Sequence, residues 1–206
     1  EEVGFDMAWL GESQMISKDA YVALALAARE TKKIFLGPGV ANPVTRHPTV
    51  LANTMAALNE IGGGRAVLGI GTGDSAVHTI GARPATVNQL RADVECMRAL
   101  FEGDEVLINE TPARLLTAGE SVPIWISASQ PRMLQLAGAV ADGVVVMGGA
   151  EPGITKWQID HVRRGAEAAG RSLDDVFVDL WFGISLADDV EKALQDVRPW
   201  ATSQAR

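Results

Sequence analysis

The sequence predicts an α/β fold built from repeated strand–helix units, and three observations support this prediction. Short apolar runs alternate with amphipathic stretches along the whole chain. The apolar runs lack a strict polar alternation, which is typical of parallel strands covered on both faces. Most of the 21 glycines lie singly at the ends of predicted elements, where tight turns are needed. Such repeats form either an open, doubly wound sheet or a closed (β/α)₈ barrel.

Six strands, each followed by a helix, are predicted from apolar periodicity. The strands are expected at 5–11, 33–40, 65–71, 123–129, 142–148 and 177–186. The helices are expected at 19–31, 47–61, 87–101, 130–141, about 155–169 and from 188 onward. The clearest helix is 87–101, where apolar residues recur at three- and four-residue spacing on one face. Three tryptophans fall in strands and are expected to pack in the core: Trp9, Trp125 and Trp181.

Composition narrows the classes of function. The net charge of -8 argues against binding to nucleic-acid phosphates. The longest apolar run, residues 20–28, is far too short to span a membrane. A single cysteine cannot form an internal disulfide, which is consistent with a cytoplasmic protein. The three histidines and the cysteine are scattered, so no metal site is predicted, and the absence of a linker predicts one domain over residues 1–206.

Polar or glycine-rich segments follow five of the predicted strands, at 11–14, 37–48, 71–75, 127–131 and 147–153. In a (β/α)₈ barrel the carboxyl ends of all strands lie on the active-site face. These five segments would then meet on one rim. A site is therefore predicted there.

The segment after the third strand also fits a dinucleotide-binding fingerprint, because Gly71, Gly73 and Ala76 have the spacing G-x-G-x-x-A. Two features argue against that alternative. The motif lies on the third predicted strand and does not open the first βαβ unit, and Asp74 within the loop would repel a pyrophosphate.

Four segments in the correct order resemble the bacterial luciferase-like superfamily of flavin-dependent barrels: GFDMAWLGES, LGPGVANPVTRHP, GGRAVLGIGTGDSAVHTIGARP and VPIWISASQPRMLQLAGAVADGVVV. They are most similar to methylenetetrahydromethanopterin reductase-like enzymes, which use the deazaflavin coenzyme F420. The resemblance implies a (β/α)₈ barrel whose first strand and last strand–helix portion are absent from this chain. It also implies a homodimer, because relatives commonly dimerise.

The resemblance implies that the flavin ring lies against the 37–48 segment. A non-prolyl cis peptide bond is expected at Gly39–Val40, where the backbone bulge would press on the back of the ring. Asn42 and Thr45 are expected to be polar wall residues. Gly71 and Gly73 are expected beside the cofactor on the same rim.

A phosphate site is implied at the SASQPRM segment. Ser127, Ser129 and the backbone of Gln130 are expected to bind the cofactor phosphate, close to the amino end of a helix. Gln130 replaces the glycine that is usual in relatives, which would hinder a left-handed backbone conformation. Gly143 is expected to approach the same phosphate closely.

Two carboxylates are the candidates for proton transfer. Asp74 lies where some deazaflavin enzymes carry a proton-donating carboxylate, and the alternative is that it caps the following turn. Glu12 follows the first predicted strand, where relatives often carry Asp followed by His, but here the next residue is Ser13. Ser13 and His47 are expected to contact the substrate, although His47 precedes Pro48 and could instead cap a helix.

Three functions therefore remain open. The first is hydride transfer between F420 and a small organic substrate. The second keeps the fold but uses FMN and molecular oxygen, as in a monooxygenase. The third is a non-catalytic flavin-binding or interaction protein on a shortened barrel.

Overall fold

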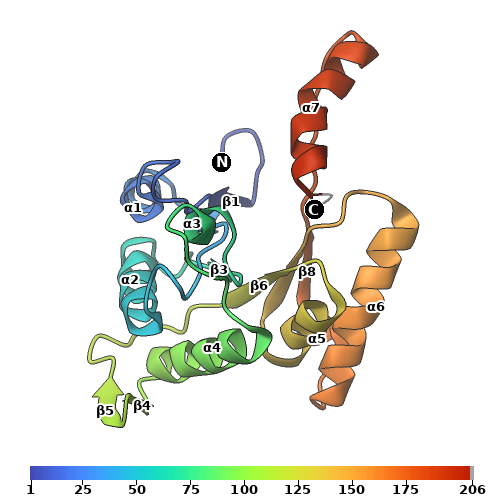
Figure 1. Ribbon diagram of the computed structural model, residues 1–206. Coiled ribbons are helices and arrows are strands. Elements are labelled where there is room, and N and C mark those ends of the chain that lie inside the picture. The colour runs from blue at the N-terminus through green and yellow to red at the C-terminus, as the bar shows by residue number, and fades with distance from the viewer. Residues whose placement is uncertain (205–206) are drawn as a thin grey trace.

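The apolar runs form six parallel strands in the computed structural model, which describes residues 1–204 and the side chains as far as residue 199 (Figure 1). The strands are β1 (Met7–Leu10), β2 (Phe35–Pro38), β3 (Leu68–Ile70), β6 (Ile124–Ala128), β7 (Gly143–Val146) and β8 (Phe177–Leu180). Each predicted strand is present, but its regular part is shorter than expected. The polar or glycine residues at the ends of the expected ranges lie in the connecting loops, where the site is built.

Four of the described helices, α1, α2, α4 and α6, begin at a residue whose side chain caps them. The carboxylate of Asp19 accepts from the backbone N–H groups of Tyr21 and Val22, and Thr86 accepts from Gln89 N–H. The helices are α1 (Ala20–Glu30), α2 (Pro48–Ile61), α3 (Ser75–His78), α4 (Val87–Phe101), α5 (Pro131–Val140), α6 (Pro152–Ala168) and α7 (Val190–Gln204), with a 3₁₀ turn η1 (Leu173–Asp175). Within residues 1–204, no helix combines the length and the apolar character that crossing a membrane would require.

The strands follow one another in the order β1-β2-β3-β6-β7-β8. Parallel ladders join β1 to β2 in one group of strands, and β3 to β6, β6 to β7 and β7 to β8 in the other. Two isolated bridges, Leu36 to Ala66 and Ala41 to Ile70, join β2 to β3. Trp9 of β1 also donates a hydrogen bond to Asp179 of β8 at 3.2 Å, so the row of strands curves until its two ends face each other. Among the described residues no strand pairing links β8 to β1, so the expected closed barrel is not seen.

The curved row of strands has two different faces. The outer face packs on the helices, and its side chains lie at even positions such as Leu36, Leu68, Ile126 and Val144. The inner face carries odd positions, and a second apolar cluster fills it: Met7, Trp9, Val67, Trp125, Val145, Met147 and Trp181. The tryptophans therefore pack as expected, but inside the curve and not under the helices.

The polar segment after α4 forms an antiparallel hairpin of β4 (Glu105–Ile108) and β5 (Thr111–Arg114). Its turn residues Asn109 and Glu110 have φ of 48° and 65°, the left-handed pair that closes a two-residue hairpin. The hairpin lies apart from the six parallel strands (Figure 1).

Candidate active site

A pocket of about 610 Å³ lies at the carboxyl ends of the parallel strands. This volume is within the range of small-molecule sites. Ten of the predicted site residues line it: Glu12, Ser13, Gly39, Val40, Asn42, Gly71, Gly73, Asp74, Ser127 and Ser129. Segments far apart in the sequence therefore meet on one rim.

The loop after β2 supplies one wall of the pocket, and the Gly39–Val40 peptide bond is cis, as expected. A Cβ at Gly69 or at Gly71 would come within 3.2 Å of the Val40 side chain, so two glycines of the next strand leave room for it. Asn42 is 2 % exposed, and its Oδ1 accepts from the N–H groups of Val44 and Thr45. The amide of Asn42 thus fixes its own loop as well as lining the pocket.

Asp74 places an exposed carboxylate at the pocket mouth. Asp74 occupies the N-cap position of α3, but its side chain is 94 % exposed and makes no capping hydrogen bond. Instead, Oδ1 lies 3.1 Å from Nδ1 of His78, one turn further along α3. The preceding Gly73 has φ of +99°, which turns the chain into this position and which L side chains rarely adopt.

The loop after β1 is tied to α3 across the pocket mouth. The hydroxyls of Ser13 and Ser75 are hydrogen-bonded to each other. The side chain of Gln14 donates to the carbonyl of Ala76 at 2.8 Å. Ser13 therefore fixes the rim of the pocket, in addition to facing it.

Glu12 lines the pocket, but both of its oxygens are engaged elsewhere. Oε1 accepts from Nε of Arg46 at 2.6 Å, and Oε2 accepts from the Tyr21 hydroxyl at 2.8 Å. Arg46 also bonds Asp19 at 2.8 Å, and its guanidinium carbon lies 4.3 Å from the centre of the Tyr21 ring. Burial, together with the negative charge of Glu12, raises the pKa of Tyr21. Glu12 therefore ties the wall of the pocket to Arg46 and Tyr21, with one hydrogen bond at each carboxylate oxygen.

The loop after β6 supplies the opposite wall. The hydroxyl of Ser127 donates to Sδ of Met147 at 3.1 Å, and Ser129 follows on the rim. The next residue, Gln130, has φ of -105°, an ordinary extended value, so the loop does not need the left-handed conformation for which a glycine is required. Helix α5 begins at Pro131, directly after this wall, and the amino end of a helix favours an anion.

Four predicted site residues lie outside the pocket lining. Thr45 donates its hydroxyl to Asn42 behind the wall, and Gln130 is exposed at the start of α5. His47 caps α2, accepting from Thr49 N–H, which is the alternative that the following proline indicated. Gly143 opens β7 at its amino end, away from the pocket, and an added Cβ there would lie 2.6 Å from the ring of Trp125. Its lack of a side chain therefore serves core packing.

Trp181 and Met147 also line the pocket. Met147 opens the 147–153 segment that the sequence placed on the rim, whereas Trp181 was expected only in the core. Trp181 comes directly after β8 and Met147 directly after β7. Gly71 was predicted as a site residue because it follows a strand at its carboxyl end, and these two residues occupy the equivalent position on their own strands. Trp181 was assigned to the core because it is an aromatic residue within a predicted strand.

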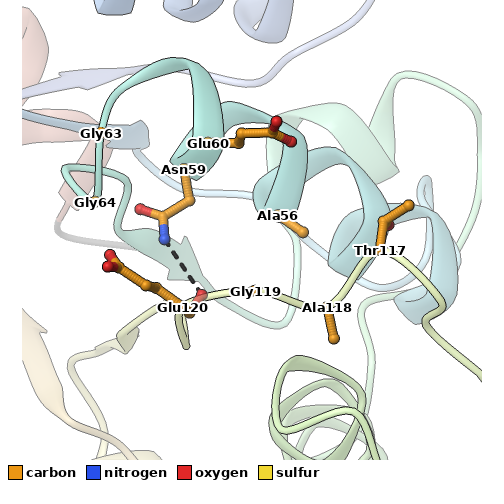
Figure 2. A pocket seen from close by; sticks show the side chains of 9 residues that line it. All are labelled: Ala56, Asn59, Glu60, Gly63, Gly64, Thr117, Ala118, Gly119 and Glu120. Atoms are coloured by element: carbon orange, nitrogen blue, oxygen red, sulfur yellow. Dashed lines mark hydrogen bonds between the residues drawn. The ribbon is translucent and has the colours of Figure 1, made fainter.

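A second pocket of about 530 Å³ lies between the end of α2 and residues 117–120 (Figure 2). Figure 2 shows Asn59, whose Nδ2 donates to the carbonyl of Glu120 at 3.3 Å. Its Oδ1 accepts from Ala66 N–H, so Asn59 joins the segments that lead into β3 and β6. This second pocket therefore lies at the amino ends of the strands. The polar segment after α4 lines it through residues 117–120, and does not line the first pocket, at the carboxyl ends, which we call the strand-end pocket.

The luciferase-like monooxygenase family model matches residues 1–205. The chain is 33 % identical over 202 residues to a 5,10-methylenetetrahydromethanopterin reductase of Methanolobus tindarius, covering 94 % of this chain and 61 % of that protein. It is 35 % identical over 191 residues to an F420-dependent glucose-6-phosphate dehydrogenase of Nakamurella multipartita, covering 86 % and 56 %. The chain thus spans less than two thirds of either relative.

Among solved structures, the chain is similar to the coenzyme F420-dependent tetrahydromethanopterin reductase of Methanopyrus kandleri. The TM-score is 0.82 at 30 % identity, covering 96 % of this chain and 63 % of that one. The similarity in structure and in sequence shows that the two proteins share a fold.

Proposed function

The chain belongs to the luciferase-like monooxygenase family, and from that premise we propose that it is an oxidoreductase that transfers hydride between coenzyme F420 and a small organic substrate. The observation that carries the proposal is the pocket at the carboxyl ends of the strands, where ten of the residues predicted for this chemistry converge. The relatives named as F420-dependent support the choice of cofactor.

The pocket lining holds most of the residues that we assign to the cofactor, together with two carboxylates, Glu12 and Asp74. At Gly11 the absence of a side chain leaves the rim open, because no other atom lies within 4 Å of a Cβ built there. Val40 would form the support for the ring, with Asn42 and Gly71 beside it. Ser127 and Ser129 would hold the phosphate, together with the amino end of α5. When bound, F420 supplies the hydride chemistry, and the protein supplies position and electrostatics.

Of the two candidate carboxylates, Asp74 is the one we assign to proton transfer. It is open to the pocket mouth, whereas both oxygens of Glu12 are engaged by Arg46 and Tyr21. Asp74 would hold or release the proton at a carboxylate oxygen, with His78 orienting that group. Glu12 would keep the pocket wall in place. Ser13 would contact the substrate at the rim.

We also propose that the six parallel strands are consecutive strands of a (β/α)₈ barrel, in one domain over residues 1–206. The curvature that brings Trp9 to Asp179 supports this, as does the likeness to the solved reductase. A homodimer is proposed as well, and light scattering of the native protein at several concentrations would test it.

Parallel binding titrations with F420 and with FMN test the proposed function, with fluorescence as the readout. We expect F420 to bind much more tightly, and a screen of organic substrates without oxygen would then follow. A preference for FMN would replace the proposal with an oxygen-using monooxygenase. Binding without turnover of any substrate would favour a flavin-binding protein, and binding of neither cofactor would refute the assignment.

A further inference from the structure

Asp179 places a carboxylate among the aromatic rings of the inner face. Its Oδ2 accepts from Nε1 of Trp181 at 2.8 Å and from Nε1 of Trp9 at 3.2 Å. Both indole N–H groups, which need a partner when buried, are satisfied by one oxygen. This arrangement lies directly beneath the strand-end pocket, because Trp181 itself lines that pocket.

The indole of Trp181 is held from three directions. Asp179 fixes its nitrogen edge. The ring of Trp9 lies edge-on to it, with centroids 5.7 Å apart and planes at 61°. Gly39 lies against the far edge, and even a single added Cβ there would come 2.6 Å from Cη2 of Trp181. The indole therefore cannot swing toward β1 or β2, and the same side chain lines the pocket.

A fixed indole in a pocket wall is suited to contact with a planar ring. Aromatic contacts of this kind change affinity by roughly two- to tenfold beyond the effect of the buried area. Because the side chain is ordered before binding, little side-chain entropy is lost when a ligand arrives. Trp181 lines the same pocket as Gly39 and Val40, and Gly39 lies directly against the indole.

We propose that Trp181 is a ring-positioning residue of the pocket, and that Asp179 is a positioning residue that acts on the bound ring through Trp181. Together they set how deeply and at what tilt the planar ring of the cofactor lies. This inference rests on the proposed function, since it requires a flavin or deazaflavin in the pocket.

A double-mutant cycle separates this role from a merely structural one. We expect Trp181→Phe to weaken F420 binding a few-fold and Trp181→Ala to weaken it by about tenfold. Asp179→Asn is expected to weaken binding in the wild-type background and to have little further effect in the Trp181→Phe background. Bound F420 should also quench less tryptophan emission in Trp181→Phe than in the wild type. Trp157→Phe is the matched control, because Trp157 lies on α6, outside the pocket, and is 46 % exposed.

The outcomes distinguish the two proposals. If the wild type binds F420 or FMN but Trp181→Phe and Trp181→Ala bind equally well, only the role of Trp181 is refuted. If Asp179→Asn has the same effect in both backgrounds, Asp179 acts through Trp9 on the fold and not through Trp181. If the wild type binds neither cofactor, the proposed function and this inference both fail. Circular dichroism of each variant identifies any that is misfolded, and Trp181→Phe, which keeps an aromatic ring, then decides the question.

Discussion

At the scale of single residues, Tyr21 connects the pocket wall to the pH dependence of stability. It is the only tyrosine in the chain and is 8 % exposed, with its hydroxyl donating to Glu12. Burial raises its pKa above the ordinary value of about 10. The folded protein therefore keeps a proton that the unfolded chain releases above that pH. The stability that Tyr21 contributes is complete below about pH 10 and is lost as the pH rises further, by up to about 1.4 kcal/mol per pH unit.

A single tyrosine makes this prediction measurable. The ultraviolet absorbance of tyrosinate should appear only as the protein unfolds, so its alkaline transition should coincide with the loss of circular dichroism. In urea, the same absorbance should appear with a midpoint near about pH 10. Tyr21→Phe should remove this part of the alkaline destabilisation. Tyrosinate formation near pH 10 in a protein that is still folded would contradict the prediction.

Asp74 gives the residue-scale prediction for activity. We expect Asp74→Asn to lower kcat by roughly 10²-fold or more, the usual contribution of a general acid or base. Its affinity for F420 should change little, because the carboxylate lies at the mouth and not at the ring support. Asp104→Asn is the control, since Asp104 is exposed and outside the pocket. An unchanged kcat in Asp74→Asn would remove Asp74 from the mechanism.

The sequence identified many of the residues that line the pocket but not their hydrogen-bond partners. Position at a strand end was enough to identify Gly71 and Ser127, because parallel strands bring their carboxyl ends together. The engagement of Glu12 could not be predicted, since its partner Arg46 lies 34 residues away and the choice of partner depends on how the loops fold. Gly143 misled because a glycine is equally useful for ligand approach and for packing against a ring.

At the scale of elements, the hairpin of β4 and β5 shows where sequence patterns were insufficient. The turn Asn109–Glu110 has a left-handed conformation at both positions, for which Asn-Gly is the usual signal. Glu110 lacks that signal, and Pro112 within β5 argues against a strand. By contrast α4 was predicted with its observed bounds, because its apolar period is regular over 15 residues. Regular burial on one face is visible in a sequence, whereas an exposed two-stranded hairpin is not.

The packing of α5 on α6 yields an element-scale prediction for stability. A Cβ at Gly138 would lie 2.0 Å from the backbone carbonyl oxygen of Val162, so the two helices touch through backbone. Helix propensity alone predicts that Gly138→Ala stabilises α5 by up to about 1 kcal/mol. We expect the opposite, a loss of roughly 1–3 kcal/mol in the free energy of unfolding, because backbone cannot move aside cheaply.

Urea denaturation of Gly138→Ala shows whether the substitution lowers or raises the free energy of unfolding. Gly119→Ala is the matched control, because no other atom lies within 4 Å of a Cβ built there and its φ is not positive. Its free energy of unfolding should change by less than about 0.5 kcal/mol. A Gly138→Ala variant as stable as the wild type would show that the helices can separate to admit the methyl group.

At the scale of the whole molecule, the two faces of the strand row explain why the sequence left an open sheet and a barrel both possible. Strands such as 143–146 are apolar at every position, because one face meets the helices and the other meets the inner cluster. An open doubly wound sheet gives the same pattern. The hydrogen bond from Trp9 to Asp179, 170 residues apart in the sequence, distinguishes a curved row of strands from an open sheet. The periodicity of a single sequence carries no information about such a contact.

Trp9 therefore gives the prediction for the whole fold. Its ring lies 5.5 Å from that of Trp125 and 5.7 Å from that of Trp181, and it bonds Asp179. The β1–β2 pair is otherwise joined to β3 by two isolated bridges. We expect Trp9→Ala to lower the free energy of unfolding by roughly 3–5 kcal/mol, against less than about 1 kcal/mol for Trp157→Ala on the surface.

Amide hydrogen exchange of Trp9→Ala would show which strands lose stability. If Trp9 holds the two groups of strands together, exchange in β1 and β2 should accelerate far more than in β6 and β7, because local opening then no longer requires global unfolding. Equal acceleration in all strands would mean that the molecule unfolds as one unit with or without Trp9. The curve would in that case be maintained by the outer helices, and the inner cluster would only fill space.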